Sequence, residues 1–460
     1  MKKGAKEFLI YSGCFALSYF AYVTILAVQD AEINRVLGAE AHAISHYLKI
    51  LPRALGLMSF FLLRKLFQGE RARKYLIISV YLIFTLSMLA MYIPDIGIIR
   101  ILPFISSLAL GHLWGALNYI MAMGLLMNPM RGRIFGTGAA MGVILQVALQ
   151  NSVSIKGNIL FSVLSAIIFI AIIVTVVKPS KYWIFENPLE FTDEDQGWKR
   201  SVQRQIIIAA VILLIINFLC IGFDTHFTGS FAASSLDIYG APRLMFAGGF
   251  LLAGFMMDHK GGQYFKTALF AVFLLSVSQL MMPFIPGFEN GFLSLYYFYA
   301  AFYVFFTMLP WYLLAGRSKN PEFFSSFGMA LSDILEAVSA MIIMFLLKIN
   351  ESMPFISMMV LILLLILLYL ILNFSGFDPD IMPAAKFPSD NAGPADFLSS
   401  YPLTPREREV AILLVTTDKA MKVMAGDLGI SERSLYRYTK SIYEKTSTLN
   451  RTELVKKYLS

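Results

Sequence analysis

Long apolar runs separated by short charged segments dominate residues 1–373. Runs of about 20 residues are long enough to cross a bilayer, and they recur about twelve times here. We place these spans near 8–28, 43–63, 75–93, 101–126, 134–151, 159–177, 206–223, 241–257, 264–285, 292–315, 323–347 and 354–373. The pattern predicts an all-α, polytopic membrane bundle of twelve helices. The fifth and eighth runs are short and rich in Gly, so their boundaries are the softest.

Residues 403–460 show a different pattern, in which short apolar stripes alternate with charged positions. Thr404 suits a helix N-cap, with Pro405 at the first helical position and Glu407 three residues after the cap, which is the capping-box spacing. An apolar stripe at helical spacing follows, formed by Val410, Leu413 and Leu414. The last predicted helix covers roughly 451–459. The sequence therefore predicts a small helical module of four helices.

The two middle helices of this module have the pattern of a helix-turn-helix. The first covers about 420–428 and stops at Gly429. Ser431 caps the second, which carries Leu435, Tyr438 and Ile442 on one side. A helix, a glycine turn and a Ser-capped helix are typical of DNA-reading modules.

The outward face of the Ser-capped helix carries groups that donate hydrogen bonds to guanine edges or phosphates. These residues are Arg433, Ser434, Tyr436, Arg437 and Lys440. Residues 403–460 contain eleven Lys and Arg against seven Asp and Glu, a net charge of +4, which suits a polyanionic partner. The pattern favours double-stranded DNA as the partner, and the alternative is a small helical domain that binds protein.

Three stretches of the module resemble the LuxR-type DNA-binding domain of bacterial regulators. They are Leu403-Thr404-x-Arg406-Glu407-x-Glu409-Val410, Ala425-x-x-Leu428-Gly429-Ile430-Ser431, and Ile442-Tyr443-x-Lys445 followed by Asn450-Arg451. The resemblance implies that Tyr436, Arg437 and Lys440 touch the major groove and that the last helix mediates a homodimer. The candidate DNA-binding residues are Ser431, Arg433, Ser434, Tyr436, Arg437, Lys440 and Lys445.

The composition excludes a chain of several soluble domains, because 57% of the residues are apolar and only 15% are charged. A mean hydropathy of +0.67 fits a polytopic membrane protein. Cys14 and Cys220 both lie in apolar runs and offer neither a disulfide framework nor a metal-ligand spacing. The sequence has no Gly-rich phosphate loop and no nucleophile elbow. We therefore expect no cofactor, no metal and no enzymatic activity.

Positive charge is distributed unevenly between the two sides of the predicted bundle. Lys2, Lys3 and Lys6 place the N-terminus in the cytoplasm. The loops on that side carry Arg64, Lys65, Arg71, Arg73, Lys74, Arg131, Arg133, Lys178, Lys181, Lys199, Arg200, Arg204, Lys260, Arg317 and Lys319. The loops on the other side hold only scattered charges. Because an even number of spans returns the chain to its starting side, we expect a multi-pass cell-membrane protein with both termini in the cytoplasm.

The twelve spans split into six and six around the polar loop 178–205. This layout resembles the major facilitator superfamily over about residues 8–373, and Gly254-x-x-x-Asp258-His259-Lys260-Gly261-Gly262 is similar to that superfamily's loop motif. The resemblance implies two six-helix halves, 8–177 and 206–373, within a sensor-like membrane domain, 1–373. The repeated Phe-Gly pair that opens the fifth and the eleventh spans agrees with two related halves.

Ionisable side chains inside predicted spans are candidate functional positions, since they are costly in a membrane. The second span carries His42, His46, Lys49 and Arg53 on one helical face, and the eleventh carries Asp333 and Glu336 on one face. In a six-plus-six fold of the resembled type, these two spans face each other across the halves. We expect Arg53 and Asp333 near the midplane, with Lys49 and Glu336 nearer the outside. The predicted cluster comprises His46, Lys49, Arg53, Asp333 and Glu336. It either holds one conformation or binds a polar ligand, and purely structural salt bridges are the alternative.

Residues 374–402 contain five prolines and small polar residues, which predicts a flexible, mostly disordered linker to the DNA-binding domain, 403–460. These parts together predict a membrane-bound, one-component transcription regulator that responds to a small molecule or a membrane signal. The alternatives are a transporter with a regulatory or DNA-binding tail, and a membrane protein whose tail binds protein only.

Overall fold

The computed structural model is built of helices, as its apolar and capping patterns predict. It describes residues 3–38, 48–93, 95–125, 128, 130–175, 200–232, 240–259, 264–281, 287–315, 318, 320–349, 353–375, 394–399, 401–416, 421–448 and 450–459. The chain divides into a membrane unit, Met1–Ile381, and a C-terminal module, Met382–Ser460. The all-α class predicted for both parts is confirmed.

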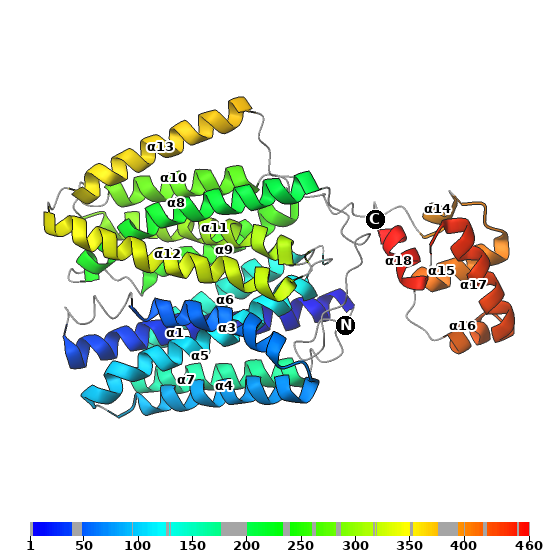
Figure 1. Cartoon of the computed structure of the whole chain (residues 1–460), viewed down its shortest axis with the longest axis horizontal. Coiled ribbons are helices and arrows are strands. Elements are labelled where there is room, and N and C mark those ends of the chain that lie inside the picture. The colour runs from blue at the N-terminus through cyan, green and yellow to red at the C-terminus, as the bar shows by residue number, and fades with distance from the viewer. Residues whose placement is uncertain are drawn as a thin grey trace. The chain divides into compact units, whose positions relative to one another are not determined.

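The described part of the membrane unit contains twelve α-helices, which form two groups of six (Figure 1). The first half consists of α1 (Lys3–Leu37), α3 (Ile50–Leu66), α4 (Glu70–Ala90), α5 (Ile96–Gly124), α6 (Arg131–Ser152) and α7 (Ile155–Thr175). The second half consists of α8 (Arg200–Ala232), α9 (Leu244–His259), α10 (Tyr264–Met281), α11 (Glu289–Ala315), α12 (Pro321–Ile349) and α13 (Met353–Ser375), with a short 3-10 turn, η2 (Ala241–Arg243), before α9.

Eight described helices are long and apolar enough to cross a membrane by length and composition. The apolar stretches Gly157–Ile172 of α7 and Ile356–Leu372 of α13 are shorter. The remaining two are α3, which has 17 residues and carries three basic side chains, and α9, which has 16. The eighth predicted span, which corresponds to α9, is therefore the shortest of the twelve helices. Large apolar side chains remain exposed on the helix exteriors, as on α13, and this fits contact with lipid.

The two halves of the membrane unit meet through pairs of helices that cross the boundary between them. α3 packs against α12, α6 against α9, and α5 against both α11 and α12. The loop 178–205 that joins the halves lies outside the described residues, apart from its last few positions. Within the described residues, the two halves are therefore held together by contacts between helices.

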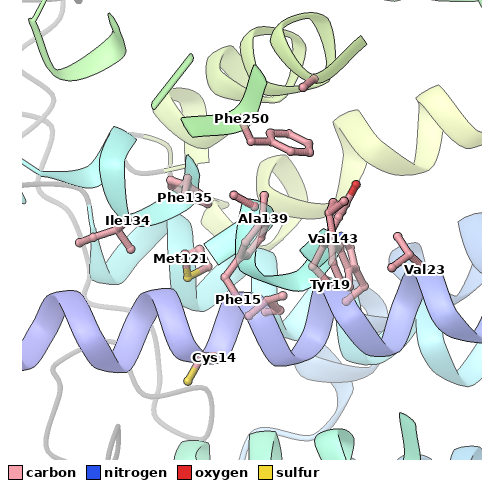
Figure 2. Packing of buried hydrophobic residues seen from close by; sticks show 14 of the residues in the cluster. Cys14, Phe15, Tyr19, Val23, Met121, Ile134, Phe135, Ala139, Val143 and Phe250 are labelled. Atoms are coloured by element: carbon pink, nitrogen blue, oxygen red, sulfur yellow. The ribbon is translucent and has the colours of Figure 1, made fainter. Parts of the chain in front are cut away.

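Aromatic side chains from both halves form the centre of the membrane unit's core. The ring of Tyr19 in α1 lies 5.8 Å from that of Phe250 in α9, and Phe135 of α6 stacks on Tyr312 of α11 at 5.1 Å. Figure 2 shows Phe250 extending from α9 over the side chains of α1 and α6. Because aromatic pairs carry a directional preference as well as a large buried area, this core ties the halves together at a defined position.

Helices α3 and α5 approach each other closely at two glycines. A Cβ at Gly111 would lie 2.1 Å from the carbonyl oxygen of Arg53, and a Cβ at Gly56 would lie 2.1 Å from the carbonyl oxygen of Leu108. Only residues without a side chain allow two helix backbones to meet in this way. The two glycines therefore fix the height of Arg53 relative to α5.

The C-terminal module contains five helices among its described residues and has a core of its own. They are α14 (Pro394–Ser399), α15 (Pro405–Thr416), α16 (Met421–Asp427), α17 (Glu432–Thr446) and α18 (Arg451–Leu459). The fully buried core side chains include Leu398, Val410, Leu414, Leu435 and Ile442. The four helices predicted from capping and apolar spacing are present within a few residues of their expected bounds.

The prediction of a mostly disordered linker over 374–402 is wrong at both of its ends. α13 continues to Ser375, and α14 forms at Pro394–Ser399 and packs against α15. Leu398 of α14 is buried in the core of the module, and Phe397 and Tyr401 pack against that core. The physical reason is that these apolar side chains are spaced to reach one face of a helical turn. Residues 376–393 lie outside the described residues.

The close contact at Gly111 yields a test of the membrane unit's packing. We expect Gly111→Ala to destabilise the full-length protein by about 1–3 kcal/mol, because the new methyl group forces α3 and α5 apart. Gly248 also lies inside a helix but has no atom within 4 Å of an added Cβ, so Gly248→Ala is the matched control and leaves stability unchanged or slightly higher. Thermal unfolding of both variants in detergent measures the difference. Equal melting temperatures would contradict the packing.

Candidate functional site

The turn between α16 and α17 sets the position of the helix that carries the predicted DNA contacts. Gly429 has a φ of +62°, and the amide of Ile430 donates to the carbonyl oxygen of Ala425 at 3.0 Å, which is the hydrogen-bond pattern of a Schellman stop. Ser431 then caps α17, because its hydroxyl accepts from the amide of Ser434 at 3.1 Å. The helix-turn-helix geometry thus follows from one glycine and one serine.

Helix α17 has a buried side and an exposed basic side. Leu435, Thr439 and Ile442 are buried, while the opposite face exposes Arg433, Tyr436, Arg437 and Lys440. Tyr436 is 57% exposed, although it is a large aromatic residue. Within the described residues, no carboxylate forms a salt bridge with the three cations of this face. Their charge therefore remains available to a polyanion.

Two of the residues predicted to contact DNA are engaged within the helix cap. Ser431 and Ser434 bond to each other through the cap, with their hydroxyl oxygens 2.9 Å apart. Ser434 is half-buried, while Ser431 is exposed. In the structure, both side chains therefore belong to the N-cap that stabilises the beginning of α17.

Lys445, also predicted to contact DNA, lies in an ion pair inside the module. Its Nζ donates to the two carboxylate oxygens of Glu407 at 2.7 and 2.9 Å. The Lys445 side chain is 32% exposed and that of Glu407 only 6%. The structure thus assigns Lys445 to the joint between α17 and α15, because a buried carboxylate needs a cationic partner. The sequence alone did not reveal this pairing, since the two residues are far apart along the chain.

Glu407 is the hub of a small polar network. Its carboxylate accepts from the amide of Thr404 at 2.7 Å and from the hydroxyl of Ser441 at 2.6 Å, and its own amide donates to the Thr404 hydroxyl at 3.3 Å. The predicted capping box is therefore present. Burial raises the pKa of Glu407, but hydrogen bonds from Lys445, Ser441 and Thr404 outweigh it and lower the pKa to about 2. Glu407 stays ionised and holds α15 to α17.

In the membrane unit, Arg53 of α3 and Asp333 of α12 form a buried ion pair between the halves. The Arg53 Nε and Nη2 atoms donate to the two Asp333 oxygens, each at 2.7 Å. Both side chains are nearly inaccessible, at 6% and 5% exposure. Arg53 also donates to the hydroxyl of Tyr22 in α1 at 2.5 Å. The guanidinium thus joins α1, α3 and α12 in the planar, two-point geometry that Arg forms with carboxylates.

The other predicted members of this cluster are arranged differently from the prediction. Lys49 bonds to Asp30 of α1 and both are buried, so this pair lies within the first half and does not cross to α12. Glu336 lies on α12 with an oxygen 4.0 Å from Arg53 Nη2. His46 lies outside the described residues. The expectation that all these charges meet across the halves is therefore wrong for Lys49, because Asp30 of α1 lies closer.

A second set of polar links joins the halves at the opposite end of α3. Arg64 donates to Glu322 of α12 at 3.1 Å, and both side chains are buried. Asp258 of the predicted loop motif accepts from the amides of Gly132 and Arg133 at 2.7 and 3.0 Å, at the start of α6. Sequence reasoning missed Glu322, since it lies at the edge of a span where charges are common. An acidic residue directly before a long apolar run, in what becomes the first turn of α12, is the sequence feature that could have identified it.

Comparison with known families identifies the C-terminal part of the chain. Residues 401–458 match the model described as bacterial regulatory proteins, luxR family. The module is therefore a LuxR-family helix-turn-helix domain, and this domain type implies binding to DNA. No curated protein matches the chain with significance.

Comparison with solved structures identifies the fold of the membrane unit. The human organic anion transporter MFSD10 (TETRAN) matches 80% of this chain and 100% of its own, with a TM-score of 0.52 and 14% identity. A mutant of the peptide transporter POT matches 82% of this chain and 96% of its own, with a TM-score of 0.59 and 13% identity. The E. coli fucose:proton symporter FucP matches 81% and 99%, with a TM-score of 0.51 and 12% identity. The membrane unit thus has a major-facilitator-like transporter fold in a multi-pass membrane protein. Both parts belong to classes that are typically non-enzymatic.

The different surroundings of Lys445 and Lys440 allow their roles to be separated. We expect Lys445→Met to lower the stability of the C-terminal module by about 1–3 kcal/mol, because it leaves the Glu407 carboxylate without its cation. Lys440→Met removes the same charge from an exposed position, so it leaves stability unchanged and weakens DNA binding. Local unfolding of α15 and α17, followed by hydrogen exchange in the full-length protein, measures the first effect. The assignment fails if Lys440→Met destabilises these helices as much as Lys445→Met does.

Proposed function

We propose that this chain, which joins a major-facilitator-like membrane bundle to a LuxR-family helix-turn-helix domain, is a membrane-bound, one-component transcription regulator. In this proposal the membrane unit senses a signal and the C-terminal module binds DNA in response. The observation that carries it is the exposed basic face of α17 in a chain whose larger part is a membrane bundle.

The chemistry of α17 supports base reading as well as attachment to the DNA backbone. Arg437 and Lys440 can bond to guanine edges or phosphates, and the exposed Tyr436 offers an apolar ring for thymine methyl groups. Arg433, near the N-terminus of the helix, lies where helix-turn-helix proteins approach base edges. The proposed function therefore predicts both sequence preference and a strong dependence on salt.

Topology supports a cytoplasmic position for the module. The membrane unit has twelve described helices, an even number, and the Lys-rich and Arg-rich loops of the sequence fall on one side. We place both termini on that side, where chromosomal DNA is accessible.

Dimerisation is part of the proposal. Two modules that pair through α18 would read two half-sites about one helical turn of DNA apart. A signal that changes the packing of the two halves of the membrane unit would alter the freedom of the modules to pair. Such coupling requires a signal that binds one packing more tightly than the other.

A second candidate function is transport with a regulatory tail, which the fold of the membrane unit favours. MFSD10, POT and FucP, whose folds the membrane unit resembles, are all transporters. Accumulation of a substrate in sealed vesicles separates the two functions, because a sensor binds its signal without accumulating it.

Loss of one cation from α17 tests the proposed function. We expect Arg437→Ala in the full-length, membrane-embedded protein to reduce specific DNA occupancy by roughly tenfold or more, since a base-edge contact is worth about 1–3 kcal/mol. Arg71→Ala removes an equal charge from an exposed position on α4 and serves as the matched control. Genome-wide mapping of bound DNA in cells measures both variants. An unchanged map for Arg437→Ala, with a folded module, would refute DNA reading by α17.

A further inference from the structure

The Arg53–Asp333 pair has the features of an occupied carboxylate-binding site. The Asp333 carboxylate occupies the Nε–Nη2 edge of the guanidinium with two bonds of 2.7 Å, while Nη1 donates to Tyr22. A small-molecule carboxylate would make the same two bonds, because the Arg fork recognises the planar group and not the chain that bears it. The partner is also supplied by the other half of the membrane unit, so it can be replaced without disturbing the helix that carries Arg53.

An aromatic wall continues from this ion pair. The ring of Tyr22 lies 5.1 Å from the Arg53 guanidinium carbon, and the Trp114 ring of α5 lies 4.9 Å from that of Tyr22. Tyr19 and Phe15 extend the same cluster. Ligand sites typically combine such apolar walls with a few polar groups that fix orientation.

The other buried ion pair between the halves provides a comparison. Arg64 donates to Glu322 through Nε at 3.1 Å, whereas Arg53 donates to both oxygens of Asp333 at 2.7 Å. Arg64 lies at the end of α3, next to Lys65, whereas Arg53 pairs with Asp333, which lies near the middle of α12. Arg53 is therefore the cation best placed to bind a ligand between the halves.

We propose that the membrane unit recognises a small carboxylate with an apolar or aromatic body, which displaces Asp333 from Arg53. This inference rests on the proposed sensor function and names the chemistry of its signal. The ligand carboxylate neutralises Arg53, its body packs on Tyr22 and Trp114, and Asp333 leaves the pair with α12. Binding thus favours a packing in which α3 and α12 are separated at this level, as a population shift requires.

Removal of the competing carboxylate tests this proposal directly. Benzoate is the probe, benzamide is its uncharged isostere, and binding is measured by calorimetry on the full-length protein in lipid nanodiscs. We expect Asp333→Asn to bind benzoate at least tenfold more tightly than the wild type does, with little binding of benzamide. Glu322→Gln is the matched control, since it removes the carboxylate of a second buried pair between α3 and α12, and its benzoate affinity stays well below that of Asp333→Asn.

Two outcomes overturn the carboxylate site. They are equal benzoate affinities for Asp333→Asn and Glu322→Gln, and equal affinities of Asp333→Asn for benzoate and benzamide.

If Asp333→Asn does not fold, the double variant Arg53→Gln with Asp333→Asn removes both charges together, and buried pairs tolerate this better than loss of one partner. The wild type must then prefer benzoate over benzamide and the double variant must not; the same preference in both overturns the proposal. DNA occupancy is measured separately, so failure here leaves the DNA-binding test intact.

Discussion

The ion pair between Arg53 and Asp333 constrains how the two halves of the membrane unit can be arranged. Both groups are removed from water and each neutralises the other across the boundary. Leaving one of them buried without its partner would cost about 3–5 kcal/mol, which is a large part of the total stability of a typical protein domain. Separation of α3 from α12 at this level therefore requires either water or a replacement partner. Packed interfaces of this kind favour discrete arrangements over a continuum of them, and the proposed sensor function requires such arrangements.

The rest of the membrane unit supports this constraint. Gly56 and Gly111 allow α3 and α5 to pack closely, and this close packing restricts movement of the backbone that carries Arg53. The hydroxyl of Tyr22 in α1 accepts a hydrogen bond from the guanidinium, and its ring contacts Tyr19 of the aromatic core that joins the halves. Two further links cross between the halves. Arg64 at the end of α3 pairs with Glu322 of α12, and Asp258 of α9 accepts a hydrogen bond from the start of α6. These links join α3 to α12 and α6 to α9, two of the helix pairs that cross the boundary between the halves.

The sequence predicted features that depend on nearby residues better than those that depend on distant ones. The capping box at Thr404 and Glu407, the Gly429 turn and the Ser431 cap are local, and each is present as expected. Arg53 and Asp333 could be brought together from the sequence because the resembled fold places their helices face to face. The partners of Lys49 and Lys445 could not, since each partner lies on a helix whose position next to the lysine the sequence pattern did not indicate: Asp30 lies on α1 and Glu407 on α15. The helix α14 was missed because the prolines around it outweighed a short apolar turn.

The central claim is that the Arg53–Asp333 pair sets the state that the DNA-binding module reports. Its most direct test is DNA occupancy by the intact protein in cells that carry Arg53→Asp, Asp333→Arg or both exchanges. The account predicts that each single exchange fixes occupancy at one extreme, because two like charges then repel the halves apart, and that the double exchange restores occupancy to the level of the wild type. Wild-type occupancy in both single variants, with folded protein in the membrane, would contradict it.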